Sequence, residues 1–180
     1  VVASRSVSSI GRDLLLDTAR FVACDTACRS DLRRLSVVAR PLHVRGVWHA
    51  AGIVEDATLG RQSATTLRMP FGAKAHGADD LQRSCCALPL AACAFFSSIA
   101  ALHFGAGQGN YAAANFHLDA LAWRRRAHGV AATSVQWGPW AEVGMASRGG
   151  INARMSSTGV CLILPDQGIR ALRMSVRMEY

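Results

Sequence analysis

This 180-residue sequence has no long apolar run, no second cysteine pair at zinc-ribbon spacing and only one lysine. No window holds the roughly 18 uninterrupted apolar residues of a membrane span, so we expect no membrane contact. Cys24 and Cys28 lack a second pair at zinc-ribbon spacing, so we expect no metal site. The first residues show neither an initiator Met nor a leader pattern, which suggests a piece of a longer, cytoplasmic protein whose targeting is not visible.

Charge is sparse and one-sided. Charged residues make up 18% and hydrophobic residues 51% of the chain, which argues against disorder and predicts a large core. The net charge is +8, and Lys74 is the single lysine among 20 basic residues. Such a balance raises nucleic-acid binding as a hypothesis. The densest basic run is Arg124-Arg125-Arg126, and no other basic cluster in the sequence is comparable. Because the basic residues are otherwise scattered, we expect no nucleic-acid partner.

Short apolar segments alternate with helical ones along the chain. This alternation predicts an α/β fold, a Rossmann-like doubly wound parallel sheet with helices on both faces. Ligands bind such sheets beyond the carboxyl ends of the strands. We expect Ser30 to cap one helix and Pro70 to break or kink another. The predicted strands are 1–4, 21–24, 46–52, 90–96 and 132–137, and the predicted helices are 12–18, 30–39, 64–84 and 110–128.

A Gly-x-Gly-x-x-Gly motif after an initial strand is missing. The segment 105–110 comes nearest, but it lacks the final glycine and leads into a later helix. We therefore expect an incomplete sheet, without its first strand and its glycine-rich loop. Because the phosphate-binding end of a helix would be missing too, we predict that these residues alone fold marginally and bind a dinucleotide poorly.

Four polar residues form a pattern suited to carbonyl reduction. Tyr111 and Asn115 lie four apart on one predicted helix and share a face, Ser98 follows a buried strand, and Lys74 lies upstream. A phenol with a pKa of about 10 becomes a usable acid when an ammonium stabilises its anion. A serine hydroxyl can hold a carbonyl oxygen, and an asparagine can hold a water. Each residue also has an ordinary alternative. Tyr111 could be a packing residue and Ser98 a helix cap. Asn115 could be a buried amide with satisfied hydrogen bonds and Lys74 a solvated charge.

Four segments resemble the ketoreductase domains of polyketide synthases, which are members of the short-chain dehydrogenase/reductase superfamily. Ordinary members of the superfamily read Tyr-x-x-x-Lys, whereas this chain reads Tyr-x-x-x-Asn and carries its lysine upstream, as the synthase ketoreductases do. On this resemblance, residues 1–172 are a partial ketoreductase catalytic domain and residues 173–180 a C-terminal linker. The four segments are 48–56, 95–100, 107–115 and 137–140.

The resemblance implies NADPH-dependent reduction of a β-ketoacyl thioester carried on the phosphopantetheine of an acyl carrier protein. Other synthase domains would belong to the same multifunctional chain. Tyr111 would donate the proton, Ser98 would bind the carbonyl, and Lys74 and Asn115 would tune the tyrosine and its proton relay. Arg5 could instead be a surface charge, Asp25 a helix cap and Trp140 a core residue. The implied cofactor contacts are Ser4, Arg5, Asp25, Ala50, Ala51, Gly52, Gly138, Pro139 and Trp140.

Asp56, Gln108 and Met145 are the implied residues of substrate and stereochemical control. Asp56 lies at the acidic fingerprint of B-type enzymes, and Gln108 lacks the mark linked to α-epimerised substrates. Met145 falls where the substrate lid would begin. This B1-type pattern implies a D-configured hydroxyl. Three alternatives stay open: a ketoreductase of a fatty acid synthase, a non-catalytic remnant and a basic nucleic-acid-binding module.

Overall fold

The computed structural model describes residues 2–5, 21–85, 88–103, 105–142 and 159–177. The predicted helix at 12–18 lies outside these ranges. The strands are β1 (Val2–Ser4), β2 (Phe21–Ala23), β3 (Gly46–His49), β4 (Ala92–Ser98) and β5 (Thr133–Trp137). The longer helices are α1 (Arg29–Ala39), α2 (Ala64–Phe71), α3 (Gly77–Cys85), α4 (Gly109–Ala127) and α6 (Pro165–Arg177), and the short ones are η3 (Leu59–Arg61), η4 (Gly72–His76) and η5 (Ile99–Ala101).

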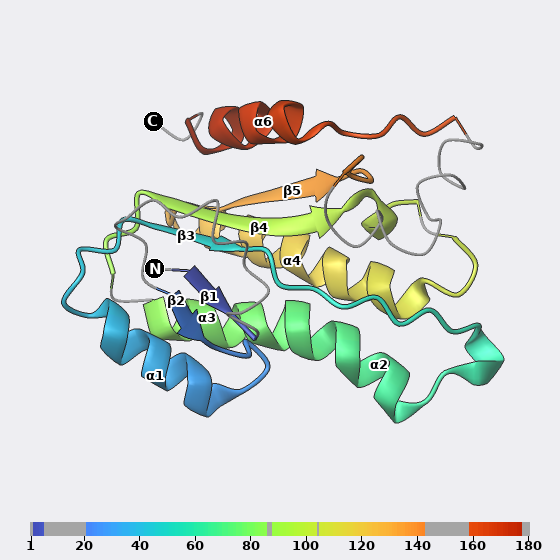
Figure 1. Cartoon of the computed structure of the whole chain (residues 1–180), viewed down its shortest axis with the longest axis horizontal. Coiled ribbons are helices and arrows are strands. Elements are labelled where there is room, and N and C mark those ends of the chain that lie inside the picture. The colour runs from blue at the N-terminus through green and yellow to red at the C-terminus, as the bar shows by residue number, and fades with distance from the viewer. Residues whose placement is uncertain (1, 6–20, 86–87, 104, 143–158, 178–180) are drawn as a thin grey trace.

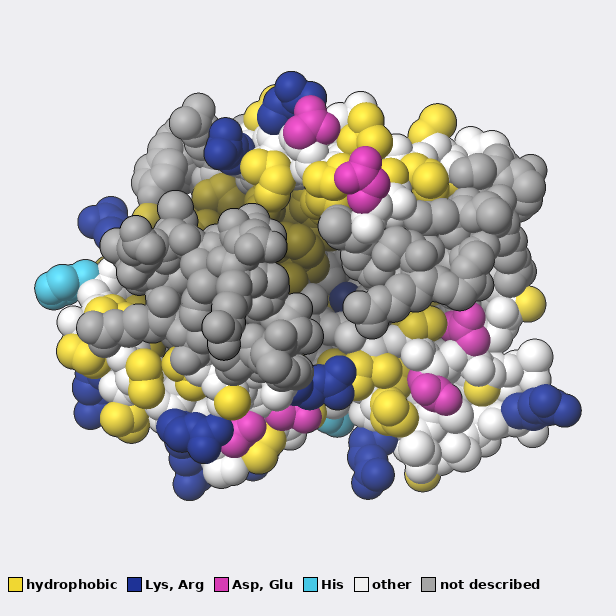
Figure 2. Space-filling view, viewed as in Figure 1, with side chains coloured by type: hydrophobic (Ala, Val, Ile, Leu, Met, Phe, Trp, Pro, Cys, Tyr) yellow, Lys and Arg dark blue, Asp and Glu magenta, His cyan; other side chains and the backbone are white. Residues whose placement is uncertain are grey.

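The strands form two parallel sheets. One contains β1 and β2, and the other has the order β3-β4-β5. Within the described ranges no strand pairing joins β1 to β3, although both sheets lie in the same part of the molecule (Figure 1). Figure 2 shows, in the same view, a recess with hydrophobic side chains at its base. The expected α/β fold with an incomplete parallel sheet is thereby confirmed.

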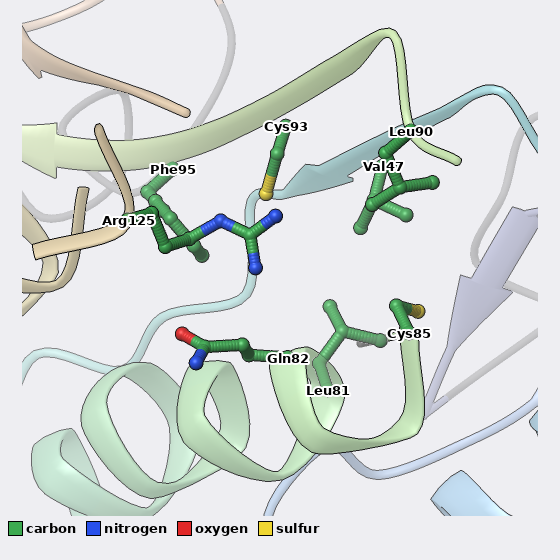
Figure 3. A pocket seen from close by; sticks show the side chains of 8 residues that line it. All are labelled: Val47, Leu81, Gln82, Cys85, Leu90, Cys93, Phe95 and Arg125. Atoms are coloured by element: carbon green, nitrogen blue, oxygen red, sulfur yellow. The ribbon is translucent and has the colours of Figure 1, made fainter. Parts of the chain in front are cut away.

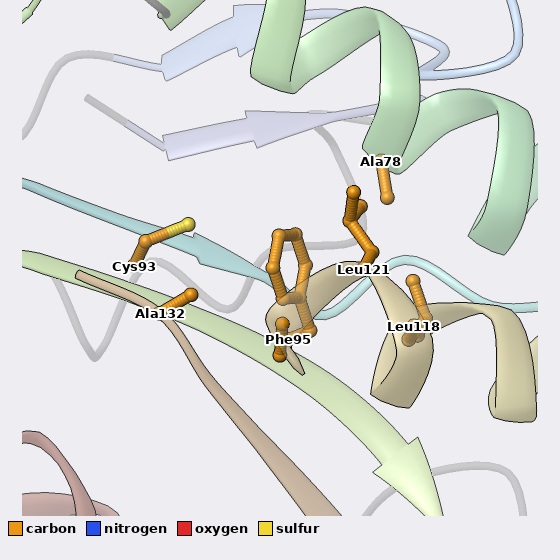
Figure 4. Close-up of a cluster of buried hydrophobic side chains, with 7 residues drawn as sticks. Ala78, Cys93, Phe95, Leu118, Leu121 and Ala132 are labelled. Carbon is orange, nitrogen blue, oxygen red and sulfur yellow. The ribbon is translucent and has the colours of Figure 1, made fainter. Parts of the chain in front are cut away.

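The core lies between β4 and the helices α3 and α4. Phe95 of β4 is 1% exposed and packs with Leu118 and Leu121 of α4 and with Ala78 of α3 (Figure 4). Alternate residues of β4 point to the opposite face, because side chains alternate along a strand. On that face lies α6 (Figure 1), whose Ser175 carbonyl accepts a hydrogen bond from the Thr133 hydroxyl. Buried on both faces, β4 is apolar almost throughout, as strands of parallel sheets are.

The helical stretch that carries Lys74 continues through its proline. Ser63 and Thr66 form a reciprocal capping box at the start of α2, which satisfies two free backbone groups. The helical stretch does not break at Pro70, so that part of the expectation is wrong, whereas a kink there stays a prediction. After Phe71 the chain passes into the π-helical segment η4 and then directly into α3. The carbonyl of Thr66, which Pro70 leaves without its helical partner, accepts a hydrogen bond from Asn110 instead.

Other local expectations need correction. The N-cap of α1 is Cys28, not Ser30, and the Cys28 side chain makes no capping hydrogen bond. The strand β4 runs to Ser98, further than expected, because Ser98 pairs with Trp137 of β5. The helix α6 was not anticipated, and it extends to Arg177; the assignment of residues 173–180 to a linker stays a prediction.

Candidate active site

Tyr111 and Asn115 lie together on the buried side of α4, as the four-residue spacing predicts. Tyr111 is 8% exposed and Asn115 is completely buried. The Asn115 amide Nδ2 donates to the Tyr111 carbonyl at 2.8 Å. Its other polar atom, Oδ1, has no hydrogen-bond partner among the residues that the structure describes. A buried amide oxygen without a partner is costly, so this atom is suited to accept from a water or a substrate group.

Ser98 lies at the carboxyl end of β4, where the strand gives way to η5. Its hydroxyl accepts from the Ala100 backbone N–H at 3.2 Å, so the capping role proposed as its ordinary alternative is present. The Ser98 side chain also lowers the pKa of the Tyr111 phenol through hydrogen bonding that favours the phenolate. Ser98 therefore combines a capping bond with a place beside the Tyr111 phenol.

Lys74 is a buried cation, not the solvated charge of its ordinary alternative. Its side chain lies in η4, the residue is 3% exposed, and Nζ donates to the Phe96 carbonyl at 2.7 Å. Nζ lies 5.6 Å from the centre of the Tyr111 ring, within the range of a cation–π contact. Burial lowers the Lys74 pKa to about 8, although the Asp119 carboxylate opposes this by favouring the charged form.

The Tyr111 phenol is less acidic than the sequence predicted. Burial raises its pKa above the usual value of 10.0, and the hydrogen bonds of Asn115 and Ser98 lower it by smaller amounts. The negative charge of Asp56 raises it further. The Lys74 ammonium is not among these causes, so its expected effect on the Tyr111 pKa stays a prediction. The predicted proximity of the lysine and the tyrosine is nevertheless present.

Asp56 and Gln108, which the sequence associated with stereochemical control, lie near the N-terminal end of α4. Gln108 Nε2 is 3.5 Å from Asp56 Oδ2, which joins two positions that the sequence associated with substrate control. The next residue after Asp56, Ala57, donates its backbone N–H to the Gly107 carbonyl at 2.9 Å, which gives the loop of Asp56 a second contact with the residues before α4. Gly107 has a φ of +86°, a conformation that favours glycine. Met145 lies outside the described residues.

Comparisons with known proteins agree with this geometry. A family model described as "KR domain" matches residues 9–142. Polyketide synthase GfsA of Streptomyces halstedii is 42% identical over 159 residues, which cover 86% of this chain and 2% of that protein. A mycocerosic acid synthase-like polyketide synthase of Mycobacterium tuberculosis is 38% identical over 171 residues, or 95% of this chain and 8% of that protein. This chain thus spans a small fraction of the length of these relatives.

Solved structures show the same likeness. A structure described as an A1-type ketoreductase has a TM-score of 0.84 at 35% identity, over 90% of this chain and 35% of that chain. The first ketoreductase of the tylosin polyketide synthase has a TM-score of 0.76 at 38% identity, over 89% of this chain and 35% of that one. This chain belongs to the polyketide synthase ketoreductase (KR) domains of the short-chain dehydrogenase/reductase superfamily.

The expected cofactor residues of the KR domain follow the ends of β1, β2, β3 and β5. Arg5 is exposed just after β1, so its guanidinium is free to reach a ligand phosphate. Asp25 Oδ1 accepts from the Ala27 N–H, and the Asp25 N–H donates to Asp31, so the turn before α1 is fixed. After β3, Ala50 is exposed and Ala51 and Gly52 are partly exposed. Contact of these residues with a dinucleotide along the strand ends stays a prediction.

The region after β5 is more tightly packed than expected. The Trp140 ring lies 5.0 Å from that of Trp137, and its backbone bridges to Ile163. A Cβ atom on Gly168 of α6 would overlap with the Trp140 ring, so this glycine is required by packing. These contacts match the core alternative for Trp140. Contact of Gly138, Pro139 and Trp140 with a nicotinamide stays a prediction.

Three residues of the KR site were not identified from the sequence: His49, Asp119 and Asn110. His49 is 2% exposed, and its Nε2 lies 3.2 Å from the Lys74 carbonyl. Burial, together with the nearby Lys74 charge, lowers the His49 pKa to about 4, so the ring is neutral at pH 7. Asp119 accepts from Ser134 at 2.6 Å and from the Gln136 amide at 2.8 Å. Two of the three missed residues thus interact with Lys74. His49 lies within hydrogen-bond distance of the Lys74 carbonyl, and the Asp119 carboxylate favours the charged form of the Lys74 side chain.

The small pocket of Figure 3 is separate from this site. Gln82 and Arg125 line it together with apolar side chains of α3, β3 and β4 (Figure 3). Its volume is about 10 Å³, room for about one water. No group of three or more His, Cys, Asp and Glu residues in the described ranges could hold a metal ion. None of the described helices is long and apolar enough to cross a membrane.

Proposed function

We propose that this KR domain uses NADPH to reduce a β-ketoacyl thioester, bound to a carrier protein, to the β-hydroxyacyl form. The observation that supports this proposal is that Lys74, Ser98 and Asn115 all lie close to Tyr111, with Nζ 5.6 Å from its ring centre. The residues come from η4, the end of β4 and α4. A proton donor, a hydroxyl that can hold a carbonyl and a nearby cation are the groups that this reaction needs.

The bound nicotinamide would supply the hydride that reaches the carbonyl carbon. The residues of the chain would manage the proton. Ser98 donates a hydrogen bond to the carbonyl oxygen, and the Tyr111 hydroxyl transfers its proton to the same oxygen as negative charge develops there. The Lys74 ammonium stabilises the resulting phenolate through space. A water held by Asn115 Oδ1, which lacks a described partner, would then relay a proton from solvent to the phenolate.

NADPH is proposed over NADH because Arg5 follows β1. An exposed guanidinium beside the serine at a strand end suits a 2′-phosphate, which it can bind through two parallel hydrogen bonds. Replacement of Arg5 by Ala should weaken NADPH binding more than NADH binding. A chain that loses affinity for both cofactors equally would contradict this assignment.

The proposed products carry a D-configured hydroxyl. The support is Asp56, the residue of the B-type fingerprint, which lies 3.5 Å from Gln108 at the start of the tyrosine helix. The substrate would arrive on the phosphopantetheine of an acidic acyl carrier protein that meets this basic chain, with its net charge of +8. Such an encounter should weaken as salt rises. Absence of binding to a carrier protein at low salt would count against this partner.

The test uses an extended chain, in which the first strand and glycine-rich turn of the family precede Val1. It is given NADPH and a β-ketoacyl thioester, and loss of NADPH absorbance is followed. Tyr111→Phe should lower kcat by roughly 10²- to 10⁴-fold, the usual contribution of a general acid. Tyr180→Phe is the matched control, because the chain has two tyrosines, and it should keep the parent rate. Equal, measurable rates for Tyr111→Phe and the parent would remove Tyr111 from the reaction, whereas no reduction by the parent would indicate a non-catalytic remnant.

A further inference from the structure

Asn110 joins three segments of the active site, and no role has been assigned to it above. It is the second residue of α4, directly before Tyr111, and it is 3% exposed. A buried amide at the start of a helix must find partners for two N–H groups and one oxygen. All three are used here.

The Asn110 amide donates twice and accepts once. Nδ2 donates to the Glu55 carbonyl at 2.8 Å and to the Thr66 carbonyl at 2.7 Å. Oδ1 accepts from the Tyr111 N–H at 2.8 Å, one of the N–H groups that the start of a helix leaves free. One side chain therefore contacts the loop of Asp56, the helix that leads to Lys74 and the residue that carries the phenol.

The contact with Thr66 has a specific cause. In an α-helix the carbonyl of residue 66 accepts from the N–H of residue 70, but Pro70 has no N–H. Pro70 is among the most buried side chains, so water does not readily reach this position. The carbonyl freed by the proline therefore becomes an acceptor for a donor from another helix. Lys74 follows Pro70 by one turn along the same helical stretch.

We propose that Asn110 is a positioning residue that fixes the Tyr111 helix against the Lys74 helix through the carbonyl left free by Pro70. This role rests on the proposed reduction, in which the phenol and the ammonium must keep a set separation. The amide suits the role because it donates to two carbonyls, whereas an aspartate would place negative charge against both. A serine would reach one partner at most.

The link that Asn110 makes between the two helices, called the clamp below, is tested first through stability. The measurement uses the 180-residue chain without any cofactor. Asn110→Ala should lower Tm by about 4–8 °C, because it leaves buried backbone groups without partners. Pro70→Ala gives residue 70 an N–H that can bond to the Thr66 carbonyl. In the Pro70→Ala background, Asn110→Ala should therefore lower Tm by only about half as much. Equal losses in both backgrounds would show that the two residues are not linked and would overturn the proposal.

The effect on the reaction is tested in the extended chain. Asn110→Ala should lower kcat by about 10- to 100-fold, the order of loss expected when reacting groups shift by up to about 1 Å, with KM nearly unchanged. Gln62→Ala is the matched control: the Gln62 amide donates to the Ala57 carbonyl and accepts from the Thr66 hydroxyl, so the substitution loosens the same two segments but leaves the three hydrogen bonds of Asn110 in place. Its kcat should stay within about twofold of the parent value.

A double substitution separates positioning from general loosening. If Asn110 acts by placing Tyr111 relative to Lys74, then Asn110→Ala should cost less than about threefold in a Lys74→Met chain. A full additional loss there would refute positioning. Should Asn110→Ala not fold, Asn110→Ser retains one hydrogen bond and is measured in the same two ways. If the parent chain shows no reduction, the proposed function fails, and the stability measurements with Pro70 decide the clamp alone.

Discussion

Because Lys74 is buried, we predict that the effect of replacing it on the free energy of unfolding changes sign with pH. Burial lowers the Lys74 pKa from 10.5 to about 8; since one pKa unit equals about 1.4 kcal/mol, the protonated side chain costs about 3 kcal/mol on folding. The residue is 3% exposed, so solvent screening reduces this little. Below pH 8 both states bind the proton and the cost is complete. Between pH 8 and 10.5 the unfolded state binds more protons, so stability rises with pH.

Lys74→Met should therefore stabilise the chain at pH 7. The substitution removes the cost of about 3 kcal/mol but also removes the hydrogen bond to Phe96, worth about 1 kcal/mol, so we expect a net gain of about 2 kcal/mol. Above pH 10.5 the lysine is neutral in both states, and the same variant should be less stable than the parent by about 1 kcal/mol.

Urea denaturation of the parent and the variant at both pH values measures this crossing. Comparison of the two chains cancels most effects of other groups that titrate in the range, such as Tyr111 and the cysteines. Arg83→Met is the control, since it removes one positive charge from a side chain that is 66% exposed and should change little between the two pH values. A Lys74→Met chain that is less stable by the same amount at both pH values would refute the reasoning.

Three further outcomes follow from the same structure. Asp119→Asn should move the alkaline fall of kcat to lower pH, because Asp119 raises the Lys74 pKa; an unmoved pH profile would exclude this coupling. Gly107→Ala should cost about 1–2 kcal/mol in urea denaturation because its φ is +86°, whereas Gly60→Ala, with open space around it, should not. NADPH titration of the 180-residue chain should show weak binding, and the extended chain should bind more tightly; tight binding by the shorter chain would contradict the incomplete phosphate site.

Local patterns predicted most of the fold and the four central residues of the site. Strand β4 and helix α4 were predictable because each carries a strong apolar pattern with clear ends. The convergence of Tyr111, Ser98 and Lys74 was predictable from the order of elements, because parallel strands present their carboxyl ends at one edge. The helix α6 was missed, although it is strongly amphipathic and begins at Pro165.

What the sequence could not provide depends on contacts between distant segments. The pKa of Tyr111 is raised because the folded chain buries the phenol, and burial is not visible in residue spacing. The partners of Asn110 lie 44 and 55 positions away. One local signal did exist: a proline inside a helical pattern leaves a carbonyl four residues earlier without its donor. A search for a buried amide on a neighbouring helix would have led to Asn110.

The burial of Lys74 also bears on whether the chain is a catalyst or a remnant. Within the described ranges no carboxylate lies within ion-pair distance of Nζ, and the charge is satisfied by a carbonyl alone. A buried ammonium without a paired anion is a source of instability that an apolar side chain would remove. Its place is nevertheless 5.6 Å from a buried tyrosine ring, with Asp119 held nearby by two hydrogen bonds. A destabilising charge held beside a proton donor is what a working reductase requires and what a structural remnant has no use for.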